Sequence, residues 1–369
     1  MITVLSLFSG GGGLDLGFIS EGYKILWAID NTPNAVATYK ANIGDHIVCE
    51  DINRVNVAAL PKADVVIGGP PCQSFSLAGN RHTEDDRGRL VWKYIEIIDS
   101  VKPKAFVFEN VTGLQSARNK AGEKILPQLE KAFQEIGYTI NVKVLNAADY
   151  GVPQRRNRVI IVGLKSGKHF EFPKPTHSEQ PELTGLKPYV SVRDALGDLP
   201  PASEDDKDVL TYSTQPENDF QAMMRSSTGI TEHTLPQMSE LDKFICHHVR
   251  PGGNYMDIPT NVNSTRIRRL QINGGHTTCY GRMDPNKPSY TINTYFNRPN
   301  VGCNIHFAEE RLITIREALR LQSFPDSYRI VSTSKQGKHL IVGNAVPPLL
   351  GKVIACQLKA YLGGADNVD

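Results

Sequence analysis

The first 165 residues alternate short apolar runs with segments of helical periodicity. The apolar runs span residues 2–8, 24–29, 63–67, 105–108 and 158–162. One helical stripe between them consists of Leu90, Tyr94, Ile97, Ile98 and Val101. Pro33 fits the first turn of another helix, which ends near Gly44. Strands that alternate with helices predict an α/β fold with a parallel sheet covered on both faces.

Residues 166–308 break this rhythm. They are rich in Pro, Gly, Asn and Thr and hold few periodic segments, which is typical of an irregular domain. Helical periodicity returns from Thr314 to Gln322 and again from about Pro347 to Tyr361. The pattern therefore predicts an α/β domain over 1–165, a second domain over 166–308 and a helical C-terminal part over 309–369.

Composition narrows the class of protein without identifying it. Hydrophobic residues make up 40% of the chain and charged residues 22%, which are ordinary fractions for a soluble globular protein. We find no long apolar run and no basic leader, so we expect neither a membrane span nor a signal peptide. The six cysteines lack Cys-x-x-Cys spacing, which favours thiols in a reducing cytoplasm over zinc ligands, and we expect no metal site.

The net charge of +2 averages over two opposite regions. Residues 179–242 hold thirteen acidic and four basic side chains, whereas residues 243–298 hold eight basic and two acidic ones. This asymmetry indicates a surface that faces a polyanion, although a solvated basic face would give the same counts.

Several predicted strands end in residues that are unusual for a simple turn, and a doubly wound sheet binds ligands at that edge. The first strand ends at Gly10-Gly11-Gly12-Gly13, where the backbone can approach a ligand closely. The Gly-x-Gly-x-x-Gly pattern fails because Asp15 or Leu16 occupies its last place, and no Lys-Ser/Thr pair follows. The loop therefore favours a nucleoside ligand over NAD or a nucleoside triphosphate, with a plain tight turn as the alternative.

Two carboxylates follow the next strands. Asp30 lies about 20 residues beyond the glycines, where an acidic side chain accepts hydrogen bonds from ribose hydroxyls. Asp51 is a candidate for binding an adenine amino group. Either residue would serve equally well as a helix cap or turn residue.

A thiol, a carboxyl and a cluster of arginines complete this set. Cys72 follows the rigid segment 68–71, and a loop thiol is intrinsically nucleophilic. Glu109 ends an apolar strand and is a plausible proton donor that Asn110 could orient. The arginines of residues 154–158 fit a phosphate or a carbonyl oxygen. The alternatives are a loop cysteine without a role and ordinary surface ion pairs.

In this order, the residues resemble the DNA cytosine-5 methyltransferases of bacterial restriction–modification systems over nearly the whole chain. Six motifs of that family are matched. They are Phe8-Ser9-Gly10-Gly11-Gly12, Pro71-Cys72-Gln73, Glu109-Asn110-Val111, Gln154 with Arg156 and Arg158, Arg316 to Pro325, and Gly343-Asn344-Ala345-Val346-Pro347. The chance assembly of six motifs is far less probable than that of any single pattern.

The resemblance implies a Rossmann-like sheet that binds S-adenosylmethionine, with a smaller irregular target-recognition domain. Residues 1–165 would form the catalytic domain, 166–308 the recognition domain, and 309–369 would return to the catalytic domain. Asp30 would hold the ribose, and Asp51 and Ile52 would lie near the adenine. The other implied cofactor contacts are Phe8, Ser9, Gly10, Gly12, Gly13, Pro70, Asn344 and Val346.

The resemblance also implies roles in catalysis. Cys72 would attack C6 of a cytosine flipped out of the duplex. Glu109 would protonate N3 and bind the exocyclic amine, while Arg158 would bind O2. Arg156 would support Arg158 or bind the DNA backbone. The product would be 5-methylcytosine, and the reaction needs no metal.

Duplex DNA is the implied substrate. Gln73, Ser76 and Arg87 belong to a segment that would close on the flipped base. Arg266, Arg268 and Arg269 would grip phosphates or read guanine edges. Such an enzyme would act as a monomer on nucleoid DNA in the bacterial cytoplasm. It would protect host DNA from a separate cognate restriction endonuclease.

Three other interpretations stay open at this point. Cytosine-5 methyltransferases of tRNA share most of these motifs, but their Cys-Phe-Thr signature is absent because Cys279 is followed by Tyr280. A catalytically silent DNA-binding relative would be expected to lose Cys72, Glu109 or the glycine loop. An NAD oxidoreductase fails on the glycine pattern.

Overall fold

The computed structural model describes residues 1–71, 86–119, 121–205, 208–227 and 229–363, and for residues 86–88 only the backbone. The predictions for Cys72, Gln73 and Ser76, and for the side chain of Arg87, lie outside the described residues. The chain forms two compact units. Unit 1 comprises residues 1–146, 157–174 and 350–369, and unit 2 comprises residues 147–156 and 175–349.

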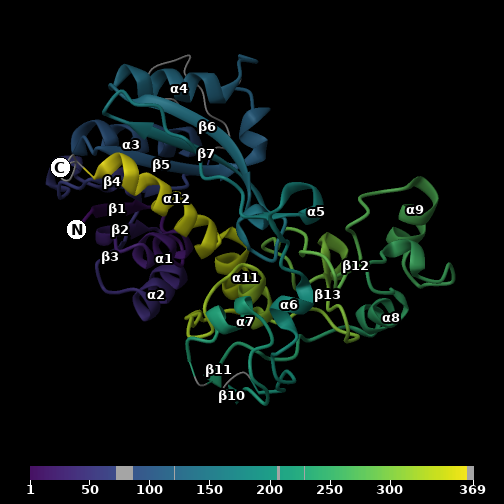
Figure 1. The fold of residues 1–369 in the computed structure, drawn as a ribbon. Coiled ribbons are helices and arrows are strands. Elements are labelled where there is room, and N and C mark those ends of the chain that lie inside the picture. Colours follow the sequence, from purple (N-terminus) through teal and green to yellow (C-terminus); the bar gives the residue numbers. More distant parts are fainter. Residues whose placement is uncertain (72–85, 120, 206–207, 228, 364–369) are drawn as a thin grey trace. The chain divides into compact units, whose positions relative to one another are not determined.

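Unit 1 is built on a seven-stranded sheet with the order β3-β2-β1-β4-β5-β7-β6 (Figure 1). Its strands are β1 (Thr3–Leu7), β2 (Lys24–Asp30), β3 (Ile47–Cys49), β4 (Val65–Gly68), β5 (Ala105–Val111), β6 (Thr139–Asn146) and β7 (Asn157–Leu164). The α/β class predicted from the sequence is confirmed.

The expectation of a wholly parallel sheet is wrong at β7. This strand pairs antiparallel with β5 on one side and with β6 on the other. The connection from β6 to β7 is only residues 147–156, with the short 3-10 helix η4 (Ala147–Tyr150), which is too short for a crossover, so the chain returns antiparallel. As a result the start of β7, with Arg158, lies beside the carboxyl end of β5.

Helices cover both faces of the sheet, as the strand pattern predicts. Leu5 and Leu7 of β1 pack into one hydrophobic cluster with α3 (Asp86–Val101) and α4 (Ile125–Glu135). Ser6 lies between them and faces the other side, where it bonds Asp15 of α1 (Gly13–Ser20). Two further helices of this unit are α2 (Pro33–Asn42) and, from Leu350 onwards, α12 (Pro348–Leu362).

The predicted stripe on α3 is part of this core. Tyr94, Ile97 and Ile98 are fully buried. The Tyr94 ring packs edge-on against Phe108 at 5.3 Å between centroids, and its hydroxyl donates to the Val107 carbonyl at 3.0 Å. The aromatic core therefore fixes α3 against β5, the strand that carries Glu109.

Among its described residues, unit 2 holds short helices and three two-stranded pairs, in line with the predicted irregularity. Its helices are α5 (Pro181–Thr184), α6 (Val192–Leu196), α7 (Asp219–Met224), α8 (Glu240–His248), α9 (Thr265–Asn273), α10 (Ile315–Leu321) and α11 (Lys335–Asn344). Its strands are β8 (His177–Ser178) with β9 (Lys187–Pro188), β10 (Leu210–Thr211) with β11 (Gly229–Ile230), and β12 (Gly281–Arg282) with β13 (Cys303–Ile305). Residues 309–349 belong to this unit, whereas the sequence assigned them to a part returning to the first domain.

Buried arginines organise unit 2 where apolar segments are short. Arg320 is fully buried and forms ion pairs with Asp198 at 2.8 Å and Asp326 at 2.6 Å. Arg316 is fully buried as well, and it donates to the carbonyls of Thr231 and Tyr328. The Arg316–Pro325 motif thus supports the fold of unit 2.

One stretch of the described residues, 335–362, is long and apolar enough to cross a membrane by length and composition. It consists of two helices, α11 and α12, separated by residues 345–347. Leu350, Ile354 and Leu358 are fully buried in unit 1. Core helices pass the same test, so this stretch is weak support for a membrane span.

Candidate active site and cofactor loop

The loop between β1 and α1 has the open backbone that its glycines predict. Phe8 and Gly10 both have φ of 55° and Gly12 has φ of 85°, a region that favours glycine. A Cβ on Gly12 would lie 2.2 Å from Cδ1 of Ile43, so a side chain there would also displace the end of that isoleucine. A Cβ on Gly10 would meet nothing within 4 Å, so the loop is open there.

Asp30 lies beside this loop, as the sequence predicts. One carboxylate oxygen accepts from the Gly10 amide at 2.9 Å, and the other accepts from the Thr32 amide at 2.8 Å. The side chain therefore connects the end of β2 to the glycine loop and to the start of α2. Each oxygen keeps a lone pair for a further donor.

A chain of hydrogen bonds connects the glycine loop to β1, α1 and α2. Ser9 Oγ donates to Ser6, and Ser6 Oγ donates to Asp15 Oδ2, both at 2.9 Å. The Tyr39 hydroxyl donates to Asp15 Oδ1 at 2.9 Å. Burial raises the pKa of Asp15 to about 6. Sequence reasoning gave Asp15 no role, although a carboxyl between Leu14 and Leu16 on a buried helix was a usable signal.

Asp51 and Ile52 have structural roles in the described residues. Asp51 accepts from the Asn53 amide at 2.9 Å and caps the short 3-10 helix η1 (Ile52–Arg54). Ile52 belongs to the hydrophobic core. Their predicted contact with adenine stays a prediction.

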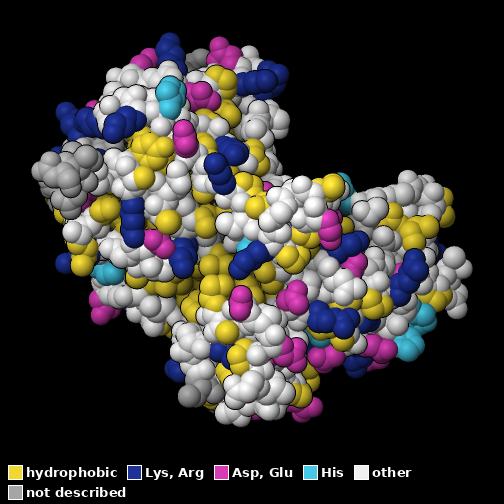
Figure 2. Space-filling view, viewed as in Figure 1, with side chains coloured by type: hydrophobic (Ala, Val, Ile, Leu, Met, Phe, Trp, Pro, Cys, Tyr) yellow, Lys and Arg dark blue, Asp and Glu magenta, His cyan; other side chains and the backbone are white. Residues whose placement is uncertain are grey.

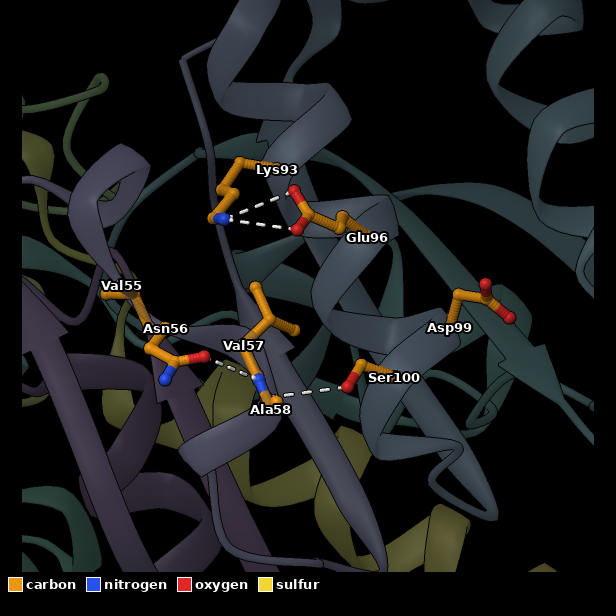
Figure 3. A pocket seen from close by; sticks show the side chains of 8 residues that line it. All are labelled: Val55, Asn56, Val57, Ala58, Lys93, Glu96, Asp99 and Ser100. Atoms are coloured by element: carbon orange, nitrogen blue, oxygen red, sulfur yellow. Dashed lines mark hydrogen bonds and ion pairs between the residues drawn. The ribbon is translucent and has the colours of Figure 1, made fainter.

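A hollow opens near this segment, between Val55 to Ala58 and one face of α3 (Figure 3). Lys93 and Glu96 of α3, which form an ion pair at 3.1 Å, point toward each other on one side of it. None of the residues that line the hollow is a predicted site residue, so we assign it no role.

Glu109 and Arg158 meet at the sheet edge. Arg158 Nε lies 2.7 Å from Glu109 Oε1, and both side chains are nearly buried, at 11% and 12% exposure. The antiparallel pairing of β5 with β7 places them there, although they are far apart in sequence. The two residues thus present an anionic and a cationic group side by side.

Backbone neighbours fix this pair. A Cβ on Gly69 would lie 2.7 Å from Glu109 Oε2, so the carboxylate occupies the space of a missing side chain. Asn110 Nδ2 donates to the Pro70 carbonyl at 2.7 Å. Asn110 therefore holds the segment that leads to Cys72. Sequence reasoning treated Gly69 only as part of a rigid turn, because its contact with Glu109 crosses two strands.

Arg156 does not fit the predicted contact with the DNA backbone. Its side chain is fully buried, and it donates to the carbonyls of Ile292 at 2.9 Å and Gly343 at 2.8 Å. Gln154 is also fully buried and accepts from the Ile292 amide at 3.2 Å. This burial disfavours a contact with the DNA backbone, and the alternative, that Arg156 supports Arg158, stays a prediction.

The other predicted residues of unit 2 lie as follows. Arg155 forms an ion pair with Glu179. Asn344 is the exposed last residue of α11, and Val346 follows it half-buried. Because both belong to unit 2, their predicted contact with the cofactor stays a prediction.

Among the described residues, His306, Glu309 and Glu317 could in principle hold a metal. Arg311 already pairs with both carboxylates, with Nη2 at 2.8 Å from Glu309 and 2.7 Å from Glu317. Although burial opposes it, Arg311 lowers the pKa of Glu317 to about 2. The arrangement is an arginine-centred ion-pair cluster and does not need a cation.

Comparison with known proteins identifies the family. Residues 2–360 match the family model of the C-5 cytosine-specific DNA methylases. The Type II methyltransferase M.NgoFVII of Neisseria gonorrhoeae is 36% identical over 94% of this chain and 83% of its own length. The Type II methyltransferase M.AgeI of Thalassovita gelatinovora is 32% identical over 98% of this chain and its entire length.

The fold is shared with solved structures. A prophage-encoded E. coli protein described as a DNA modification methyltransferase superposes with a TM-score of 0.74 at 24% identity, over 98% of this chain and 99% of that one. The family match favours DNA methylation over the tRNA, silent-binder and oxidoreductase interpretations. The chain belongs to the C-5 cytosine-specific DNA methylase family and is a DNA cytosine-5 methyltransferase that uses S-adenosylmethionine.

Proposed function

We propose that Cys72, Glu109 and Arg158 methylate C5 of a cytosine flipped out of a specific duplex DNA site. The observation that carries this assignment is the Glu109–Arg158 pair, with 2.7 Å between Nε and Oε1. In cytosine, O2 is an acceptor, and N3 lies between it and the exocyclic amine. A guanidinium beside a carboxyl matches these neighbouring positions, with Arg158 on O2 and Glu109 on N3 and the amine.

The attacking group comes from the segment that Asn110 holds. Pro70 and Pro71 stiffen the chain directly before Cys72. In the proposed reaction the Cys72 thiolate bonds to C6, Glu109 gives a proton to N3, and C4–C5 becomes part of an enamine. C5 would then take the methyl group, for which the sulfonium of the donor would leave as a neutral thioether. The C5 proton leaves to solvent, the C6–S bond breaks to release the thiolate, and the N3 proton returns to Glu109.

The glycine loop fits the methyl donor. Open space at Gly10 allows a ligand to approach the backbone, and Asp30 offers a carboxylate beside it. These residues would hold the nucleoside part of S-adenosylmethionine, which supplies an electrophilic methyl group on a sulfonium. Phe8 and Ser9 would shape the loop, and the remaining predicted cofactor contacts are retained as proposals.

We further infer the setting of the reaction. Unit 1 would carry catalysis, and unit 2 would contribute recognition of the DNA. The enzyme would act as a monomer on nucleoid DNA in the cytoplasm, where it would protect the host from a cognate restriction endonuclease. The Type II methyltransferases among its relatives support this setting.

The test uses duplex DNA libraries that contain 5-fluorocytosine, together with S-adenosylmethionine. Fluorine does not leave C5 as a proton does, so the protein should stay covalently attached to the DNA. We expect a denaturation-resistant adduct with the wild type and none with Cys72→Ser. Sequencing the trapped DNA gives the target site.

Two results would contradict the proposal. An adduct that persists in Cys72→Ser would assign the nucleophile elsewhere. Adducts with RNA but with no DNA library would make RNA the substrate. Glu109→Gln keeps the size of the side chain, so it serves as a matched variant, and we expect it to lower the rate of adduct formation.

A further inference from the structure

Helix α9 has one buried side and one broad exposed side. Ile267 is fully buried and Leu270 packs into the cluster that joins α9 to α8. Ser264 caps the helix by accepting from the Ile267 amide. On the opposite side Ile272 is 81% exposed. The cluster thus anchors α9 by one side and leaves the other side to solvent (Figure 1).

The exposed side follows from helical geometry. At about 100° per residue, Arg268 and Arg266 lie roughly 160° apart around the helix axis, and Arg269 lies between them. Ile272 and Asn273 lie one turn further along, on either side of Arg269. Arg269 is therefore the central side chain of this surface, and the other two arginines mark its margins.

The three arginines do not stabilise helix α9 through its dipole or through ion pairs. All three lie in the first five positions of α9, where the helix dipole disfavours cations. The helix contains no acidic residue, and within the described parts of the chain none of the three arginines forms an ion pair. A helix that concentrates uncompensated cations on one side fits a polyanionic partner.

The three side chains differ in their own contacts. Arg266 donates to the Asn300 carbonyl and Arg268 to the Val262 carbonyl, both at 3.4 Å. Arg269 has no hydrogen-bond partner among the described residues, and it lines a surface hollow with Thr265, Arg266 and Asn273. The marginal arginines are exposed and each makes one long contact to a carbonyl, and the central one is exposed without such a contact.

The positive charge of α9 does not extend over the rest of unit 2 on the face in view. On the face of the molecule in view, acidic and basic side chains are intermingled over unit 2 (Figure 2). The opposite charges of residues 179–242 and 243–298 therefore do not produce a surface of one sign on this face. The basic character of α9 therefore rests on the residues of that helix alone.

We propose that α9 is the recognition helix of this enzyme and enters the major groove of the substrate DNA. Arg269 would read a guanine through O6 and N7, while Arg266 and Arg268 would bind phosphates on opposite sides of the groove. A helix about 10–12 Å across fits a groove about 12 Å wide. This assignment rests on the proposed function, because it takes duplex DNA as the substrate.

The experiment begins with the site methylated by the wild type. Methylation and binding are then measured on that site and on every single base-pair variant of it. Arg269→Ala should reduce discrimination at one G·C pair by roughly 5- to 150-fold and leave the other positions unchanged. Arg269→Lys keeps the charge without the planar fork, so it should recover binding but not discrimination.

The marginal arginines should behave differently. Arg266→Ala and Arg268→Ala should weaken binding to all sequences alike, and each should lower the salt slope of log K by about 1. Lys243→Ala removes an exposed cation on α8 that is paired with Glu240, and it serves as the matched control with no change expected.

Several outcomes would overturn the assignment. These are unchanged discrimination in Arg269→Ala, a uniform loss of binding in that variant, or relaxed specificity in Arg266→Ala or Arg268→Ala. A wild type that neither methylates DNA nor binds it in a salt-dependent way would instead refute the proposed function. The assignment of α9 would then fail as well, because it takes duplex DNA as the substrate.

Discussion

Stability should depend on pH through Asp15, the buried carboxyl beneath the glycine loop. The perturbation is Asp15→Asn, which keeps the shape of the side chain and removes its charge. The asparagine oxygen can still accept from one of the two hydroxyls, Ser6 or Tyr39, that bond the carboxylate. The variant therefore tests the buried charge with little change in packing.

The magnitude follows from the pKa. Burial raises the pKa of Asp15 from 3.8 to about 6, so the folded state binds this proton more tightly than the unfolded state. Stability from this group is fully present below pH 3.8 and is lost as pH rises through about 6. At about 1.4 kcal/mol per pKa unit, the full effect is about 3 kcal/mol. About 1.4 kcal/mol of it falls between pH 5 and pH 8.

The assay is urea unfolding of the wild type and the variant at several values of pH between 5 and 8. The difference in unfolding free energy cancels other titrating groups, and it should move in favour of Asp15→Asn as pH rises. Tyr39→Phe removes a hydrogen bond that lowers the pKa of Asp15, so its own pH dependence should be steeper. A difference between wild type and Asp15→Asn that does not vary with pH would refute the reasoning.

Three further predictions concern single contacts. In Gly69→Ala, the new Cβ displaces the Glu109 carboxylate, so kcat should fall at least tenfold with a change of only a few degrees in Tm; unchanged kcat would contradict this. Arg311→Ala leaves Glu317 buried without its partner and should cost about 3–5 kcal/mol in urea unfolding, and a cost below about 1 kcal/mol would show that the cluster relaxes. Arg156→Lys replaces the forked guanidinium, which donates to two carbonyls, by a single ammonium, so Tm should fall. The salt slope of DNA binding should not change, and a lower slope would support a contact between Arg156 and a DNA phosphate.

Local sequence patterns predicted the helices and strands whose structure depends mainly on their own residues. The apolar stripe of α3 and the strands β1, β2, β4 and β5 follow from periodicity, and the strand ends indicated which edge carries chemistry. Strand β6 was missed because it is only half-buried, and its alternation is weak. The direction of β7 was missed because strand polarity depends on the connection and not on the strand itself.

The candidate site divides in the same way. Asp30 was predicted beside the glycine loop because both end neighbouring parallel strands. Contacts between distant segments had no local signal: Gly69 against Glu109, and Arg156 on the carbonyls of Ile292 and Gly343. Arg156 and Arg158 stand two residues apart, and the sequence does not show which arginine of such a pair is buried.

The joint around Arg156 has a consequence for how such enzymes diversify. The chain passes between the units four times, so unit 2 consists of a short piece, 147–156, and a long piece, 175–349. Gln154 and Arg156 connect the short piece to the long one through main-chain groups of Ile292, Leu321 and Gly343. A joint made to the backbone tolerates new side chains in the partner segment. Recognition segments such as α9 are therefore free to diverge, or to be exchanged between relatives, while the neighbouring Arg158 stays in register with Glu109.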